Sequence, residues 1–138
     1  MNREIKFRGR IDREDSRFYK KWMHGFLVIS NRGDRLQIQR KDDRLVFYVT
    51  PSTIGQFTGL LDKNGTEIYE GDILHVFEDD PNLEDVNTPV YFENGCFMVD
   101  VYMGRNGLCE FIWDKSGRIE VIGNIHDNPE LAEKEGGE

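Results

Sequence analysis

The chain has few of the residues that mark a secreted or membrane-bound protein. Only two cysteines, Cys96 and Cys109, occur in 138 residues, and they lie outside the CxxC spacing of metal and redox sites. No apolar run approaches the roughly 18 to 20 residues of a transmembrane helix. Polar residues follow Met1 directly, where a signal peptide would have its apolar segment. These absences set membrane residence aside and favour a reduced, cytoplasmic setting.

Side chains for catalysis and metal binding are equally sparse. His24, His75 and His126 are scattered, so no pair of histidines has ligand spacing. A Cys-His-Asp arrangement would require Cys96 or Cys109 to meet His126 in space, and buried cysteines mostly behave as small hydrophobic residues. No nucleophile, metal-ligand set or phosphate-binding loop stands out. We therefore expect no catalytic residue, no bound metal and no cofactor.

The composition is that of a folded protein with an uneven charge distribution. Hydrophobic residues make up 38% of the chain, which at this length suffices for one domain with a real core. Residues 1–50 hold 13 Lys/Arg and 7 Asp/Glu, whereas residues 51–138 hold 5 and 19, giving the net charge of -8. The two halves can attract each other within one chain or between protomers, so a homo-oligomer is an open alternative. Only the basic half could bind nucleic acid.

The first half has the alternation of β-strands. Between residues 5 and 11, apolar or glycine positions alternate with Lys6, Arg8 and Arg10, which indicates a half-buried strand. Residues 26–29 are all apolar and predict a short buried strand. With residues 36–39 and 45–50, we expect three to five strands before Pro51.

The second half predicts an antiparallel meander. A core strand is expected over residues 73–77, an exposed acidic loop over 78–88, and a last strand followed by a short helix over 118–131. Turn signals occur at three dipeptides, which are Asn94-Gly95, Asn106-Gly107 and Ser116-Gly117. A two-residue turn at the first places Phe92 opposite Phe97 and Val90 opposite Val99. At Asn106-Gly107, a two-residue turn pairs Val101 with Ile112 but also Asp100 with Trp113. The register at this turn therefore stays open.

Three pieces of the sequence resemble the YopX-type proteins of bacteriophages and prophages. They are residues 3–8 (REIKFR), residues 53–73 (TIGQFTGLLDKNGTEIYEGDI) and residues 120–131 (EVIGNIHDNPEL). The resemblance spans the chain and implies provenance and fold rather than an activity. The implied fold is all-β and mainly antiparallel, with compact barrel-like sheets and one or two short helical turns. Departures occur at Gly9-Arg10, where the family's first strand often continues into an aromatic residue, and over residues 12–50, which show little match.

We expect a single YopX-like domain over residues 1–138. It comprises a basic β half (1–50), a central turn-rich motif (51–74) and an acidic β-meander half with a short C-terminal helix (75–138). The motif residues that carry the resemblance are Thr53, Ile54, Gly55, Gln56, Thr58, Gly59, Asp62, Gly65, Tyr69, Gly71 and Asp72.

A structural role is favoured for this motif. Ser52 can cap a helical turn through Gln56. Asp62 begins a tight turn rather than a calcium loop, because Gly65 falls at the fourth position and an EF-hand needs glycine at the sixth. The carboxylate of Asp72 is expected to accept hydrogen bonds from nearby backbone amides. Alternatively, some polar side chains of the motif could face a partner.

Two surfaces are candidates for binding. Lys6, Arg8 and Arg10, with Tyr19 and Trp22 nearby, suit a nucleic acid or a partner protein, because cations interleaved with aromatic rings bind phosphates and bases. The alternative is a solvated outer face that complements the acidic half, with Tyr19 and Trp22 in the core. The carboxylates of residues 78–85 could hold a hard cation, although such loops are usually just solvated.

Three functions follow from these candidates. The first is a non-enzymatic phage or prophage accessory or host-interaction protein, in the bacterial host cytoplasm, that binds another protein, either a host or phage partner or a second copy. The second is a module for single-stranded or double-stranded nucleic acid that uses the basic first strand. The third is a metal-dependent hydrolase that uses the acidic loop.

Overall fold

The computed structural model describes residues 3–101, 104–109 and 118–132, and most of its regular structure is β-strand. The chain divides into two compact units, with the boundary between Phe57 and Thr58. The all-β, antiparallel fold class is therefore confirmed. The expectation of a single domain stays a prediction. Among the described residues, no helix is long and apolar enough to cross a membrane.

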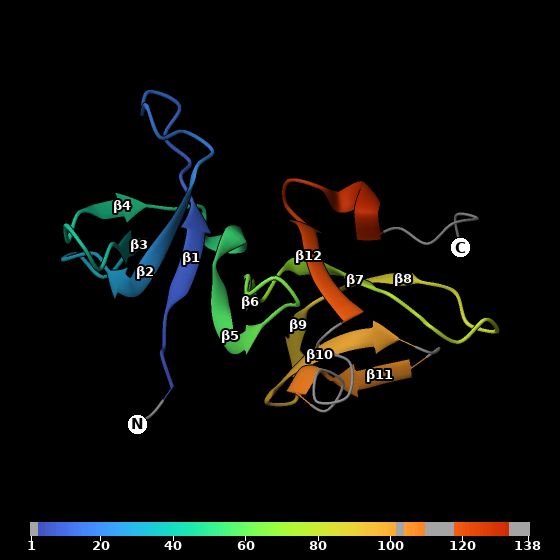
Figure 1. The fold of residues 1–138 in the computed structure, drawn as a ribbon. Helices are drawn as coiled ribbons and strands as arrows, with labels where there is room; N and C mark the ends of the chain where they lie inside the picture. The colour runs from blue at the N-terminus through green and yellow to red at the C-terminus, as the bar shows by residue number, and fades with distance from the viewer. Residues whose placement is uncertain (1–2, 102–103, 110–117, 133–138) are drawn as a thin grey trace. The chain divides into compact units, whose positions relative to one another are not determined.

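The first unit is built on one antiparallel sheet. Its elements are β1 (Phe7–Arg10), β2 (Trp22–Ile29), β3 (Leu36–Gln39), β4 (Val46–Tyr48), the 3-10 helix η1 (Pro51–Thr53) and the start of β5 (Gly55–Leu61). The strands lie in the order β4-β3-β2-β1-β5 (Figure 1). Four strands thus precede Pro51, as predicted.

A single bridge between Ile11 and Val49 brings the ends of β1 and β4 together, so this sheet curls around its own core. Buried apolar side chains form that core, and they are Ile11, Met23, Ile38 and Val49, with Phe7, Phe18, Phe47 and Ile54 packed against them. Gly9 permits the close approach, because a Cβ there would lie 2.7 Å from Cγ2 of Val49. The curl stays incomplete: the described strands form open sheets, so the implied barrel does not close.

Two expectations for this unit are wrong. Residues 26–29 were expected to be buried, but Phe26 is 48% exposed and Ile29 is 62% exposed. The reason is that β1 pairs only with residues 22–25 of β2, so the second half of β2 has no β1 alongside it. The helical turn is η1, which covers Pro51–Thr53 and does not continue to Gln56.

The second unit contains two three-stranded antiparallel sheets and the strand that follows β5. Its elements are β6 (Glu67–Tyr69), β7 (Asp72–Val76), β8 (Val86–Pro89), β9 (Tyr91–Glu93), β10 (Cys96–Val101), β11 (Gly104–Gly107), β12 (Ile119–Asn124) and the 3-10 helix η3 (Pro129–Ala132). The sheet orders are β12-β7-β8 and β11-β10-β9, and β6 neighbours β5 (Figure 1).

A second core lies between these strands. Its buried residues are Ile68, Leu74, Val76, Val90, Val99, Val101, Leu108 and Ile119, and Leu60 of β5 packs against them. The predicted core strand over residues 73–77 corresponds to β7, whose residues are buried apart from His75. Each unit therefore has its own hydrophobic core.

The first predicted hairpin has the expected turn. Asn94 and Gly95 both have positive φ (54° and 81°), as a two-residue hairpin turn requires, and Phe92 pairs with Phe97. Val90 lies before β9, and its amide donates to the carbonyl of Asp72 instead. The Phe92–Phe97 pair is therefore confirmed, whereas the predicted pair of Val90 and Val99 does not form.

The second turn signal is wrong. Asn106 and Gly107 lie inside β11, where they pair with Val99 and Met98 of β10, and Val101 pairs with Gly104. The chain therefore reverses before Asn106, because Val101 already pairs with Gly104. The residues that the alternative register would have used, 112–113, and the third signal, 116–117, lie outside the described residues.

The last strand also departs from simple alternation. The register of β12 against β7 shifts between Val121 and Gly123, a β-bulge that interrupts the alternation of its two faces. Ile119 is fully buried, whereas Ile125 is 40% exposed.

Gly25→Ala tests the tightest backbone contact of the first unit. A Cβ at residue 25 would lie 1.9 Å from the carbonyl oxygen of Gln39, which is backbone and cannot rotate away. We expect the free energy of unfolding to fall by about 3 kcal/mol, measured by urea denaturation. Gly104→Ala in β11 is the control, because a Cβ there meets nothing within 4 Å. Equal stability of the two variants would show that β2 and β3 can move apart at residue 25 without a loss of folding free energy.

Candidate binding surface

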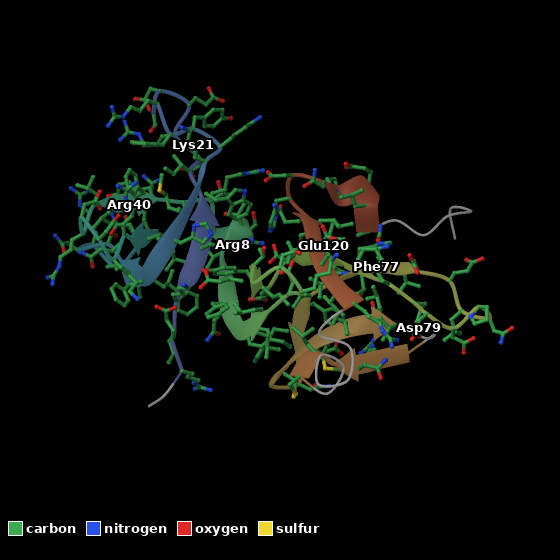
Figure 2. All side chains as sticks on the ribbon, in the orientation of Figure 1. Arg8, Lys21, Arg40, Phe77, Asp79 and Glu120 are labelled. Atoms are coloured by element: carbon green, nitrogen blue, oxygen red, sulfur yellow. The ribbon has the colours of Figure 1, made fainter. Side chains whose placement is uncertain are left out.

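The predicted cations of the first strand do not form a solvated face. Arg8 lies opposite His24 in the β1–β2 ladder and is only 8% exposed. Its guanidinium carbon lies 4.7 Å from the centroid of the Trp22 ring, a cation–π contact (Figure 2). The expectation of a solvated outer face is therefore wrong for Arg8. Arg10 lies at the end of β1 and is half-buried.

Lys6, just before β1, is engaged in an ion pair. Its Nζ lies 2.9 Å from Oε1 of Glu4 and 5.0 Å from the centroid of the Phe57 ring. Lys41 also binds Glu4, and the two ammonium groups, Lys41 foremost, lower the pKa of Glu4 to about 2. Lys6 also lines a shallow depression of about 390 Å³, together with Trp22. A role of these residues in binding stays a prediction.

The segment between β1 and β2 carries cations on aromatic rings. Phe18 packs against the core, and its ring centroid lies 4.8 Å from the Arg17 guanidinium and 5.8 Å from Lys21 Nζ. Tyr19 is exposed and is contacted by Lys20. Of the two predicted aromatic contacts, Tyr19 thus lies at the surface, and Trp22 of β2 is half-buried.

The outer face of β2, β3 and β4 presents a surface that the sequence did not predict. Phe26, Gln39 and Val46 lie opposite one another in one row across the strands. Val28, Gln37 and Tyr48 form the next row on the same face. A depression of about 730 Å³ lies here. It is lined by Gln39 and Val46 of the first row, by the second row, and by residues 29–32, 34 and 35.

Apolar side chains are exposed on and beside this outer face. The exposed fraction is 48% for Phe26, 62% for Ile29, 53% for Leu45 and 43% for Val46. The Arg35 guanidinium lies 4.3 Å from the centroid of the Tyr48 ring. Residues 26–29 are all apolar, and such a run does not show whether the faces of the strand are buried or exposed. The sequence therefore did not predict this surface.

The central motif places its polar side chains on backbone groups. The Thr53 hydroxyl accepts from the Arg10 amide at 2.9 Å and donates to the Thr50 carbonyl at 2.6 Å. The Asp72 carboxylate, 2% exposed, accepts from the Tyr69 amide at 2.7 Å. A purely structural role for the motif stays a prediction.

Asp62 makes the most extensive set of these contacts. Its Oδ1 accepts the amides of Asn64 at 2.8 Å and Thr66 at 2.9 Å, and its Oδ2 accepts the amide of Val121 at 2.9 Å. Burial raises the pKa of this carboxyl, but the three backbone N–H groups together outweigh burial, and the pKa is lowered overall. The ionised carboxylate therefore ties the turn after β5 to β12.

The acidic segment 78–85 is held by contacts within the second unit. Asp79 accepts two hydrogen bonds from the Arg118 guanidinium, at 2.8 and 2.7 Å (Figure 2). Asp85 accepts the Glu78 amide and lies 3.2 Å from Nε2 of His75, and these contacts lower its pKa. No group of three or more His, Cys, Asp or Glu side chains that could hold a metal ion is found in the described part of the chain.

Both cysteines are exposed free thiols, which corrects the expectation of small buried side chains. Exposed thiols such as these lack the apolar surroundings that make buried structural cysteines unreactive.

Comparison with known proteins identifies relatives over nearly the whole chain. The family model described as "YopX protein" matches residues 6–133. A curated relative, the "SPbeta prophage-derived uncharacterized protein YopX" of Bacillus subtilis strain 168, is 37% identical over 71 residues. These residues are 50% of this chain and 52% of the relative, so the match spans about half the length of that relative. The predicted resemblance is confirmed.

Two solved structures are similar in fold. The crystal structure of protein yopX from Bacillus subtilis is 24% identical, with a TM-score of 0.55 over 96% of this chain and 98% of the other. That of protein EF1440 from Enterococcus faecalis is 25% identical, with a TM-score of 0.54 over 93% and 97%. At this level of identity the likeness to yopX shows the fold alone.

Asp62→Asn tests the carboxylate that joins the turn to β12. The variant cannot accept three amides as an anion does, so we expect the free energy of unfolding at pH 7 to fall by about 2 to 3 kcal/mol. Because the folded pKa is lowered, this stabilisation is present above the unfolded pKa and is lost as the pH falls through the folded pKa. Urea denaturation at pH 7 and at pH 3 should therefore give a smaller difference at pH 3.

Glu84→Gln is the matched control, since Glu84 is exposed in the same unit. It should leave the stability unchanged. A stability difference for Asp62→Asn that is the same at both pH values would contradict an ionised Asp62.

Proposed function

The chain belongs to the YopX family, and on that premise we propose that it is a prophage-derived protein of the bacterial cytoplasm that acts by binding another protein. The name of the Bacillus subtilis relative supports the prophage origin. The proposal includes no catalysed reaction.

One observation carries the proposal: the sheet of the first unit leaves apolar side chains uncovered. Phe26 and Val46 lie on its outer face and Ile29 at the end of β2, and each is more than 40% exposed. Ile29 and Val46 also line the depression of about 730 Å³. Contiguous exposed apolar surface rimmed by polar residues is typical of protein contact sites, whereas isolated exposed residues are common everywhere. Tyr48 and Arg35 are of residue types that are enriched at such contacts.

The carboxylates Asp62 and Asp85, whose pKa values are lowered, are not poised as general acids. Asp62 is lowered by backbone amides within a turn, and Asp85 is lowered chiefly by the amide of Glu78. Both shifts favour the ionised form through contacts that hold local structure. A general acid at neutral pH would need the opposite shift.

A second candidate, a nucleic-acid-binding module, rests on the charge of the first unit. Residues 1–57 hold 13 Lys/Arg against 7 Asp/Glu, and Arg17, Lys20 and Lys21 lie on aromatic rings. Protein binding is preferred because carboxylates are interspersed with these cations. Arg13 pairs with Asp15 and Arg40 with Asp43, and such acidic groups repel phosphate.

The double variant Phe26→Ser, Ile29→Asp tests the protein-binding proposal. The tagged chain is used to capture partners from a Bacillus subtilis lysate, with and without nuclease. We expect a protein that is captured in both conditions and lost from the double variant, because both side chains are exposed and neither belongs to the core. Phe92→Ser in the second unit is the matched control, since Phe92 is 52% exposed.

Capture that disappears with nuclease, or that the double variant retains, would contradict the proposal. Thermal unfolding of each variant checks that the fold is kept.

Electrophoretic mobility with single-stranded and double-stranded DNA tests the second candidate. If it holds, the wild-type chain retards DNA at low salt, and Lys20→Glu with Lys21→Glu abolishes the retardation. We expect no retardation at 50 mM salt. Retardation that weakens with rising salt and with the charge reversal would replace the protein-binding proposal.

A further inference from the structure

The depression on the outer face of β2, β3 and β4 combines apolar side chains with an amide. Gln37 is half-buried and lies between Val28 and Tyr48 in one row across the three strands. Within the described residues, the Gln37 side chain makes no hydrogen bond, whereas Nε2 of Gln39 in the next row donates to the Arg44 carbonyl at 3.2 Å. Burying an amide without a partner costs free energy. A molecule that covers this row must therefore offer Gln37 both a donor and an acceptor.

Two arginines that line the depression have no carboxylate partner. Arg32 and Arg35 belong to the turn between β2 and β3. Among the described residues, neither guanidinium forms an ion pair or donates a hydrogen bond, and that of Arg35 lies 4.3 Å from the centroid of the Tyr48 ring. By contrast, Arg13 of the same unit pairs with Asp15 at 3.0 Å. Both guanidinium groups are thus available to a carboxylate of a partner, which they bind by charge-assisted hydrogen bonds.

The acidic residue beside these arginines is held by the turn itself. Asp34 lines the same depression, and its Oδ1 accepts from the Ser30 hydroxyl at 2.8 Å. Oγ of Ser30 in turn accepts the Arg35 amide at 3.3 Å, and the Ser30 amide donates to the Arg35 carbonyl at 2.8 Å. In the part of the chain that the structure describes, no ion pair joins Asp34 to Arg32 or Arg35. The side chains that line the depression therefore keep an excess of one positive charge.

Exposed apolar side chains lie beside these polar groups. Ile29 and Val46 line the depression and are 62% and 43% exposed. Apolar pocket walls with a few placed polar groups are typical of sites that bind one kind of ligand. Such a site favours a peptide segment, because its backbone supplies a donor and an acceptor and its side chains supply apolar surface and a carboxylate. The excess of six Lys/Arg over Asp/Glu in residues 1–57 attracts an acidic segment at longer range.

We propose that the depression binds a segment of a partner protein in which an apolar side chain stands next to a carboxylate. The carboxylate binds the guanidinium groups of Arg32 and Arg35. The apolar side chain covers Ile29 and Val46, and a peptide group of the segment forms hydrogen bonds with the Gln37 amide. The proposal rests on the proposed protein-binding function and adds the chemistry of the partner.

Peptide selection followed by binding measurements tests the proposal. Random ten-residue peptides displayed on phage are selected on the full-length chain, and the most enriched peptide is synthesised with a fluorescent label. We expect the enriched peptides to carry an Asp or Glu next to an aromatic or branched apolar residue. In the complex, the side-chain amide protons of Gln37 should shift in the NMR spectrum. The Kd should rise with salt, because the contact includes exposed charges.

Arg35→Gln removes one of the two guanidinium groups and should raise the Kd of the selected peptide about tenfold. Arg17→Gln is the matched control, because Arg17 is also exposed and lies on an aromatic ring but does not line the depression. It should leave the Kd within about twofold. Thermal unfolding of both variants checks that the fold is kept.

Replacing the acidic residue of the peptide by its amide tests the same contact without any change to the chain. This peptide should bind the wild-type chain about tenfold more weakly than the selected one. With Arg35→Gln the two peptides should differ much less, since the guanidinium and the carboxylate bind each other and their effects are not additive.

Several results would overturn this mode of binding. These are no enriched peptide, enriched peptides without an acidic residue, equal Kd values for Arg35→Gln and Arg17→Gln, or unchanged Gln37 amide signals in the complex. Displacement of the peptide by a ten-residue oligo-deoxythymidine would assign the depression to nucleic acid instead. Sedimentation that shows a dimer lost in Arg35→Gln would assign it to a second copy. If the amount captured from a lysate is unchanged by Arg35→Gln but is lost with Phe26→Ser, Ile29→Asp, the proposed function stands and the carboxylate contact fails.

Discussion

Strand β5 is the constraint on which both units of this protein depend. Ile54, just before it, packs against the first core, and Leu60, within it, packs against the second. Only five residues separate these two side chains in sequence, so one short segment must serve both cores. The same segment divides a cationic unit from an acidic one, since residues 51–57 carry no charge. Packing against both cores gives a physical reason for the many turn and core residues in the central motif.

Local patterns predicted the parts of the fold that local interactions decide. The strand around Arg8 and the hairpin turn at Asn94 and Gly95 depend on residues a few positions apart, and both were predictable. Asn106 and Gly107 were misread because the preceding strand ends earlier and the pair is absorbed into β11. Turn chemistry indicates where a chain can reverse, while tertiary pairing decides where it does reverse.

The binding surface was less predictable than the fold. Arg8 lies in the expected strand, yet it is buried, because the ring of Trp22, fourteen residues later, stacks on its guanidinium. Residues 26–29 form the expected strand but extend beyond its pairing with β1, so apolar side chains among them remain exposed. How far β4 is covered depends on where the pairing of Ile11 with Val49 ends and residues 12–16 turn away. Burial and free edges are properties of chain segments meeting in space, and a single sequence does not display them.

The shortness of β4 has a consequence for colloidal behaviour. An exposed strand edge is a template on which further chains can add, and long flat edges lead to fibrous aggregation. Here the open stretch ends at a charged turn with Asp42 and Asp43 on one side and at the paired Thr50 on the other. The edge of β4 is thus short and flanked by charge, and these are two of the features by which natural sheets resist the addition of further strands.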